Sequence, residues 1–173
     1  LLMRLWLWLR GPLRRTRPAA QVPQKDLLRL DTHAPLASIL GLLDPLRGAY
    51  AETQHLLLAL RVGEPRRVAR VLGLEAYLQA MGGRMGAAEA LLGRARALLA
   101  PEGDSDGALA ARALLDLAEA SIALEQGRFR QGAARADEVA AFLDEHGVGL
   151  AWVADLARTS ALLCRLWLGD LGA

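Results

Sequence analysis

The chain has 173 residues, of which 53% are hydrophobic and 5% aromatic, and its formal net charge is +2. This near balance of charge argues against strong nucleic-acid binding, which requires a dense face of Lys and Arg side chains. The lone cysteine, Cys164, excludes an internal disulfide and fits a reducing compartment, so we expect a cytoplasmic protein. Ala and Leu supply most of the apolar residues, which favours helices over strands.

The two parts of the chain differ in charge. Residues 1–70 contain 12 basic and 5 acidic side chains, a net charge of +7. Residues 71–173 contain 9 basic and 14 acidic side chains, a net charge of −5. Such an asymmetry can orient a protein toward a charged neighbour.

Residues 1–23 are predicted to be the end of an upstream helix followed by a basic linker. The first nine residues are apolar apart from Arg4, but this run is far shorter than the ~20 residues that span a bilayer. We therefore expect no membrane span and interpret the run as the end of a helix that begins upstream. Prolines at 12, 18 and 23 leave no helical period, so the segment around Arg14, Arg15 and Arg17 is interpreted as a basic linker.

The first main helices are predicted over residues 24–43 and 44–62. Pro35 is expected to break or kink the first of them into two pieces, because proline lacks an amide proton and clashes with the preceding turn. Asp44 followed by Pro45 is a helix start signal, with the aspartate as the cap.

Two tight breaks, Gly63-Glu64-Pro65 and Gly82-Gly83, delimit the next predicted helix. Its apolar side contains Val68, Leu72 and Ala76. A further helix follows and ends at Ala100-Pro101. Its buried side is predicted to contain Ala88, Leu91, Leu92, Ala95 and Leu99.

Three more helices are predicted after an acidic loop, with Asp104 or Ser105 as the first cap. Gly127 separates the first from the second, and Gly147 and Gly149 separate the second from the third, which spans about 150–168. The predicted buried stripes are Ala110, Leu114, Leu117, Ser121 and Leu124 in the first, Phe129, Ala133, Ala136, Ala140 and Leu143 in the second, and Val153, Leu156, Ala157, Ser160, Leu163, Cys164 and Trp167 in the third.

The glycine breaks recur. Gly83, Gly127 and Gly169 each follow a long helix, at spacings of 44 and 42 residues. A regular spacing of this kind indicates stacked helix pairs, here longer than the 34 residues of a standard tetratricopeptide repeat. We therefore predict an all-α fold over residues 24–173, in which antiparallel helix pairs stack into a tetratricopeptide-like right-handed solenoid of about eight helices.

From about Leu5 to Ala173 the chain resembles the helical region of certain bacterial multidomain signalling proteins. The segments that carry the resemblance are RGAYAETQHLLLALRVGEPRRVARVLGLEA (47–76), GLAWVADLARTSALLCRLWLGDL (149–171) and LWLWLRG (5–11). In those proteins a serine/threonine kinase domain and a P-loop ATPase module precede tetratricopeptide-like repeats. The resemblance implies a regulatory scaffold in a kinase–ATPase signalling protein, and it carries no kinase or ATPase residue onto this chain.

The residues form no recognisable catalytic, cofactor or metal motif. The glycine-rich segment from Gly82 to Gly86 precedes a helix but lacks the Lys-Ser/Thr of a P-loop. The histidines at 33, 55 and 146 lack the spacing of a zinc site. Cys164 lies on an apolar helical face, where burial raises the pKa of a thiol and lowers its reactivity. We therefore predict no catalytic, cofactor-binding or metal-ligating residue.

Two features are candidates for binding a partner. Arg66, Arg67 and Arg70 form a basic patch on one helix, for which a solvated face is the alternative. The tryptophans are interpreted as core residues. Trp152 is the exception, because it begins a helix next to a loop.

The whole pattern predicts a non-catalytic scaffold that holds a protein partner or a sibling domain on a rigid surface of stacked helices. The alternatives are a small helical enzyme or ligand-binding domain, and a structural oligomerisation module. We also expect the repeats to continue beyond Ala173, so that four residues near the end are partly uncovered and the isolated chain self-associates. They are Leu162, Leu166, Trp167 and Leu168.

Overall fold

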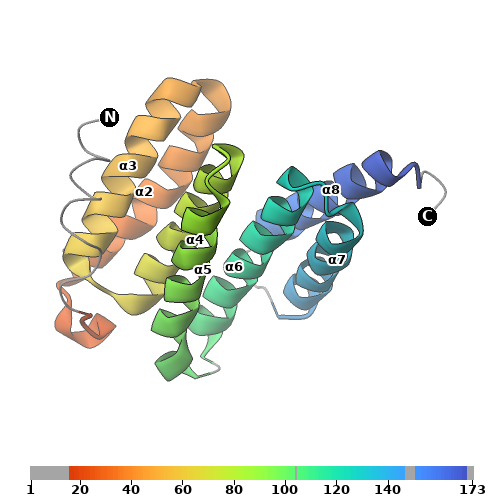
Figure 1. Ribbon diagram of the computed structural model, residues 1–173. Coiled ribbons are helices and arrows are strands. Elements are labelled where there is room, and N and C mark those ends of the chain that lie inside the picture. The colour runs from red at the N-terminus through yellow and green to blue at the C-terminus, as the bar shows by residue number, and fades with distance from the viewer. Residues whose placement is uncertain (1–15, 104, 147–150, 171–173) are drawn as a thin grey trace. The chain divides into compact units, whose positions relative to one another are not determined.

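The computed structural model describes residues 16–103, 105–146 and 151–170, and every regular element in them is helical. The all-α prediction is therefore confirmed, as Figure 1 shows. None of these helices combines the length and the apolar composition needed to cross a bilayer. The predicted helix end at residues 1–9 lies outside the described residues. The elements are η1 (Ala19–Gln21), α2 (Gln24–Leu43), α3 (Pro45–Val62), α4 (Pro65–Met81), α5 (Met85–Leu99), η2 (Ala100–Glu102), α6 (Asp106–Glu125), α7 (Phe129–His146) and α8 (Ala151–Leu168).

The chain divides into two compact units, Leu1–Val71 and Leu72–Ala173, with the boundary inside α4. In the first, the N-terminal unit, α2 and α3 pack along each other as an antiparallel hairpin (Figure 1). Apolar residues of this hairpin and of the first turns of α4 form the buried interior of the unit. They include Leu27, Leu30, Ala37, Leu56, Ala59, Val68 and Ala69.

Helix α2 is continuous over 20 residues with Pro35 in its interior, so the prediction of two separate pieces is wrong. The proline removes one amide donor, which costs about 3 kcal/mol in a helix interior. Leu30 and Ala37, on either side of Pro35, are both buried and hold the helix against its neighbours. Tertiary packing of this kind supplies most of the stability of protein helices, and here it outweighs the local cost.

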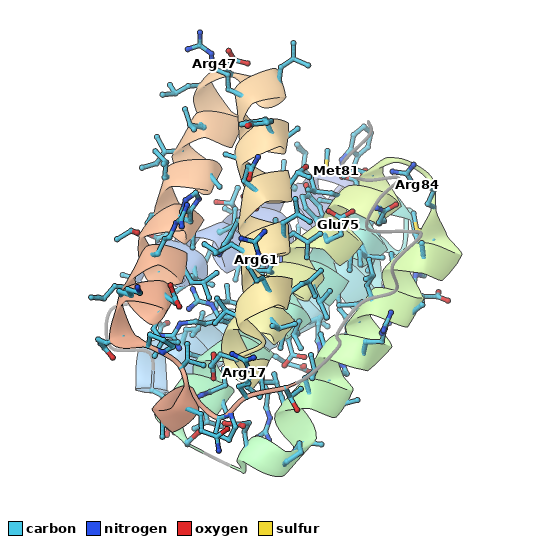
Figure 2. All side chains as sticks on the ribbon, turned by 90° about the vertical axis from the view of Figure 1, so that its left-hand side faces the viewer. Arg17, Arg47, Arg61, Glu75, Met81 and Arg84 are labelled. Atoms are coloured by element: carbon cyan, nitrogen blue, oxygen red, sulfur yellow. The ribbon has the colours of Figure 1, made fainter. Side chains whose placement is uncertain are left out.

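The turn between α2 and α3 follows its sequence signal. The Asp44 carboxylate accepts hydrogen bonds from the backbone amides of Leu46 and Arg47, at 3.0 and 3.1 Å, and Pro45 is the first residue of α3. This satisfies two amides that have no partner within the helix. Arg47 marks this end of the hairpin in Figure 2. The predicted cap is therefore confirmed.

The repeated glycine breaks share one geometry. Gly83, Gly127 and Gly169 have φ angles of 74°, 70° and 74°, a left-handed conformation that glycine adopts without steric cost. Each glycine amide donates to the carbonyl three residues earlier, and the next amide donates to the carbonyl five residues earlier. This pair of hydrogen bonds is the Schellman motif. The predicted break positions are confirmed.

In the C-terminal unit, Leu72–Ala173, α6 packs against α7 and α7 against α8. Small residues let these helices approach closely. A methyl group added at Gly132 of α7 would lie 2.8 Å from the Cys164 sulfur of α8. Cys164 is fully buried, as predicted, and burial raises the pKa of its thiol. One core cluster consists of Ala113, Leu117, Val139, Ala140, Leu143, Val153, Ala154 and Ala157, and a second, smaller cluster consists of Ala120, Ala136 and Ala161.

The stripe predicted for α6 is not its most buried side. Of its five members Leu117 is buried, whereas the other four are half-buried. The helix contains Ala and Leu at every angle, so a helical period does not select one face. Ser105 stands at the N-cap position with extended backbone, but its hydroxyl donates to the Glu102 carbonyl instead of capping the helix. The buried residues of α6 also include Ala108, Ala111, Leu115, Ala118, Ile122 and Ala123.

Candidate functional site

Helix α8 has one buried side and one exposed apolar side. Four of the seven residues predicted for its buried stripe are buried, namely Val153, Ala157, Ser160 and Cys164. The other three, Leu156, Leu163 and Trp167, are exposed, so this part of the prediction and the core interpretation of Trp167 are wrong. The physical reason is that α6 and α7 pack on one side of α8 and leave the opposite side uncovered.

Five large apolar side chains on the exposed side form a surface that we call the α8 face: Leu156, Leu162, Leu163, Leu166 and Trp167. Leu162, Leu166 and Trp167 are 63%, 56% and 67% exposed, as expected from the sequence. Residues three, four and seven apart lie on the same side of a helix, so these side chains are neighbours. A contiguous exposed apolar surface is typical of sites that bind other proteins.

A stacked aromatic pair lies at one end of the α8 face. The rings of Trp167 and Phe129 lie nearly parallel, with centroids 6.0 Å apart and 12° between their planes. Phe129 is the first residue of α7, two residues after Gly127 of the second glycine break. Parallel offset rings attract each other, so the contact restrains the indole of Trp167 and still leaves it open to a partner. Restrained aromatic side chains are common centres of protein interfaces.

Paired charges border the α8 face. Arg158 donates to both carboxylate oxygens of Asp144 at 2.6 Å and to Asp155 at 2.9 Å. These carboxylates, Asp144 first, raise the pKa of Arg158. Arg165 is hydrogen-bonded to Asp137 of α7. The border is therefore polar but internally compensated, as at the rim of a protein interface.

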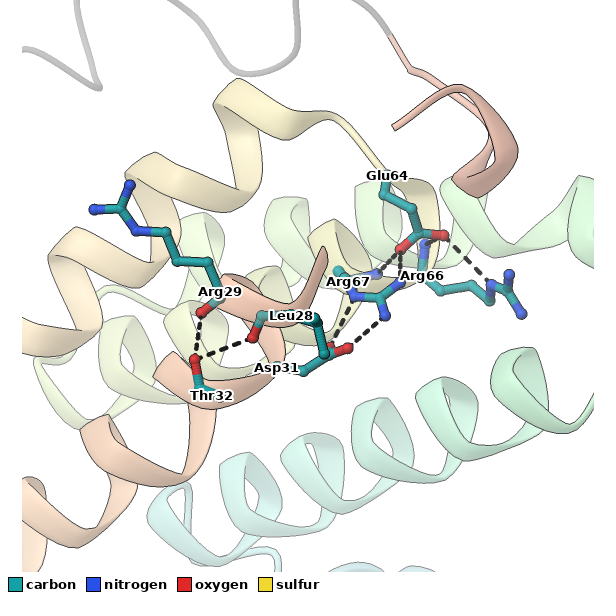
Figure 3. A network of polar contacts seen from close by, with 7 residues as sticks. All are labelled: Leu28, Arg29, Asp31, Thr32, Glu64, Arg66 and Arg67. Atoms are coloured by element: carbon teal, nitrogen blue, oxygen red, sulfur yellow. Dashed lines mark hydrogen bonds and ion pairs between the residues drawn. The ribbon is translucent and has the colours of Figure 1, made fainter. Parts of the chain in front are cut away.

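The predicted basic patch lies in the first turns of α4, and Figure 3 shows two of its arginines turned toward carboxylates. Arg67 donates from Nε and Nη2 to the two carboxylate oxygens of Asp31, at 2.8 and 2.6 Å. Its Nη1 donates to Glu64 at 3.2 Å. Arg66 reaches the same carboxylate at 3.4 Å. These contacts tie α4 to α2 within the N-terminal unit.

Glu64 is the buried centre of this network. Only 1% of the residue is exposed, and its carboxylate accepts the backbone amides of Arg66 and Arg67 at 3.4 and 2.9 Å. It therefore caps α4, where the helix dipole favours a negative charge. Sequence reasoning missed this role, because Pro65 signals the helix start but glutamate is not among the residues that usually cap one.

The other predicted partner-binding residues are placed differently. Arg70 is half-buried, and burial is the main reason that its pKa is lowered, while the Asp31 carboxylate acts in the opposite direction. Trp152 stands in the first turn of α8, and its side chain lies outside the described structure. A role of either residue in binding a partner stays a prediction.

Two histidines meet in the N-terminal unit. The rings of His33 and His55 have centroids 6.3 Å apart, and the Nδ1 atom of each is buried without a hydrogen-bond partner in the described part of the chain. The pKa of His55 is lowered to about 4, first by burial and then by His33 and Arg70, while Asp31 opposes the shift. Among the described residues, no three His, Cys, Asp or Glu side chains gather as a metal ion would require.

The lowered pKa of His55 predicts an acid-sensitive fold. The unfolded chain binds a proton at this residue below about pH 6.5, whereas the folded chain does so only near pH 4. Between these values the unfolded state holds more protons, so stability falls as the pH falls. From pH 8 to pH 5 we expect the free energy of unfolding to drop by about 2 kcal/mol through this residue alone.

Urea unfolding of the wild type and of His55→Gln at both pH values measures this contribution. The variant should lose less stability on acidification than the wild type does. His146→Gln, which changes an exposed histidine, is the matched control and should follow the wild type. Parallel pH profiles for all three proteins would show that His55 is not buried in its neutral form.

Comparison with protein-family models, with curated proteins and with solved structures finds no match to this chain.

Proposed function

We propose that this chain is a non-catalytic protein-interaction module whose α8 face receives an amphipathic helix from a protein partner or a sibling domain. The observation that carries the proposal is the α8 face itself, with its restrained tryptophan and its border of compensated charges. Burying large apolar side chains stabilises a complex by about 1.5–3 kcal/mol for each fully covered Leu-sized residue.

The packing order of the helices supports a helix as the bound element. α6, α7 and α8 pack in sequence along the C-terminal unit, each helix against its successor. A further helix placed on the α8 face would continue this order, as the proposed tetratricopeptide-like solenoid requires. The repeated Schellman motifs support the same interpretation, because each ends a helix and turns the chain toward the next.

The wider context of the proposal is a regulatory arm of a bacterial serine/threonine kinase–ATPase signalling protein. It rests on the resemblance of residues 47–76 and 149–171 to the helical region of such proteins. The lone cysteine supports a cytoplasmic location. The regulated activity, in this proposal, belongs to a sibling domain rather than to the helices described above.

Sedimentation velocity of the isolated chain tests the proposal by measuring self-association, in which a second copy of the chain covers the α8 face. We expect the wild type to self-associate with increasing concentration, because the α8 face is uncovered. Leu162→Glu combined with Leu166→Glu should weaken this association by at least about tenfold, since one lost apolar contact of about 1.4 kcal/mol already gives that factor.

The matched control is Leu28→Glu combined with Leu36→Glu, which changes two exposed leucines of α2 in the N-terminal unit. It should associate as the wild type does. A wild type that remains monomeric at high concentration would contradict the proposed role of the α8 face. A single closed species of fixed stoichiometry would favour the alternative of an oligomerisation module.

A further inference from the structure

A small pocket in the N-terminal unit lies where the segment before α2 meets the first turns of α2 and the last turn of α3. It has a volume of about 190 Å³. Three arginines and one aspartate contribute to its wall, and apolar side chains complete it. The lining residues are Arg17, Val22, Pro23, Asp26, Arg29, Leu58, Arg61 and Val62.

The three arginines come from three different segments of the N-terminal unit and have no carboxylate partner among the described residues. Arg17 precedes η1, Arg29 belongs to α2 and Arg61 to α3. No ion pair or side-chain hydrogen bond joins any of their guanidinium groups to another described residue. In Figure 3 the Arg29 guanidinium points away from the Asp31–Arg67 network. Three unpaired cations around one pocket repel one another unless an anion lies between them.

Local structure holds the arginines at the pocket. The backbone amide of Arg17 donates to the Gly63 carbonyl at 2.8 Å, which fixes the segment before α2 against the end of α3. Arg17 and Arg61, both labelled in Figure 2, line the same pocket of the N-terminal unit. The pocket also includes Pro23, the residue at the N-cap of α2, where the helix dipole is positive.

From this geometry we propose that the pocket binds a phosphate monoester or inorganic phosphate. The three arginines and Asp26 give the pocket walls a net charge of +2, and a phosphate group carries about −1.5 to −2 at neutral pH. Planar guanidinium groups bind two phosphate oxygens at once. The volume lies below the roughly 300–1,000 Å³ of sites for drug-sized ligands, which fits a single phosphate group and is too small for a whole nucleotide.

Two sources supply the same chemistry, a free phosphate ion and a phosphorylated side chain. Isothermal titration of the full chain with inorganic phosphate and, separately, with N-acetyl-phosphoserine amide distinguishes them. Sodium chloride at the same ionic strength is the reference for non-specific screening. We expect at least one of the two phosphates to bind with a Kd of roughly 1 mM or lower. Tighter binding of phosphoserine assigns the pocket to a phosphorylated side chain, and tighter binding of inorganic phosphate assigns it to the free ion.

The variant Arg17→Gln/Arg29→Gln/Arg61→Gln should weaken phosphate binding by at least about tenfold. Its control removes the same charge from three exposed arginines of the C-terminal unit and should bind within about twofold of the wild type, since none of them lines the pocket and salt screens exposed charges. That control is Arg84→Gln/Arg128→Gln/Arg130→Gln.

A variant that binds phosphate more tightly than the wild type separates the loss of a binding site from a loss of folding. Asp26→Asn removes the one acid among the lining residues and should tighten phosphate binding several-fold, a result that partial unfolding cannot produce. Binding no stronger than that of chloride would overturn the proposal. Equal losses in the two triple variants would also overturn it, because they would show attraction by net charge rather than by the pocket.

Discussion

Replacing Glu64 with alanine is expected to lower the free energy of unfolding by about 3 kcal/mol. The residue is 1% exposed, caps α4 and pairs with Arg67. Removing one partner of a buried ion pair costs about 3–5 kcal/mol, because the other charge is left without compensation. Arg67 keeps its bidentate contact with Asp31, so we expect the lower end of this range. Urea unfolding of the full chain, followed by circular dichroism, is the measurement.

A second substitution separates the charge of Glu64 from its capping role. Glu64→Gln keeps an oxygen that can accept the amide of Arg67 but removes the negative charge. It should therefore be less destabilised than Glu64→Ala by about 1 kcal/mol, the usual value of a helix cap.

The matched control for both substitutions is Glu89→Ala, which removes an exposed carboxylate from α5. It should change stability by less than about 0.5 kcal/mol, as most surface substitutions do. If Glu64→Ala were as mild as this control, the carboxylate would be solvated and the network of Figure 3 would not hold α4 to α2.

Helix ends could be predicted from the sequence because their signals are local. Asp44 caps a helix through amides two and three residues later, and Gly127 ends one through carbonyls within the preceding turns. Neither signal depends on where distant parts of the chain lie. The all-α class and the glycine breaks could be predicted from the sequence for the same reason.

Features that depend on distant partners could not be predicted in this way. Arg67 was recognisable as part of a basic patch, but its partner Asp31 lies 36 residues earlier and on another helix. Pro35 signals a break by its own chemistry, and only packing against α3 explains why α2 continues through it. Helix α8 is apolar on both sides, so its sequence does not show which side α6 and α7 cover. The candidate site is thus the part of the molecule that local patterns describe least well.

Replacing Gly48 with alanine is expected to force α2 and α3 apart and to cost at least about 3 kcal/mol. Gly48 is buried at the closest approach of the hairpin. A Cβ atom added there would overlap the Gly41 Cα atom, 2.6 Å from the Gly41 nitrogen and 3.2 Å from the Leu40 carbonyl carbon. Overpacking of side chains costs about 1–3 kcal/mol because side chains can adjust. Backbone atoms of a helix cannot, so the loss should reach or exceed the upper limit of that range.

The facing glycine provides a control with the opposite expectation. A Cβ added at Gly41 meets no atom within 4 Å, so Gly41→Ala should leave stability unchanged or slightly raised although it lies against Gly48. Gly93 in α5 is equally open, and Gly93→Ala should stabilise by about 0.5–1 kcal/mol through helix propensity alone. Thermal and urea unfolding of the three variants measure the contrast. If Gly48→Ala and Gly41→Ala unfold at the same urea concentration, α2 and α3 do not cross at these two glycines.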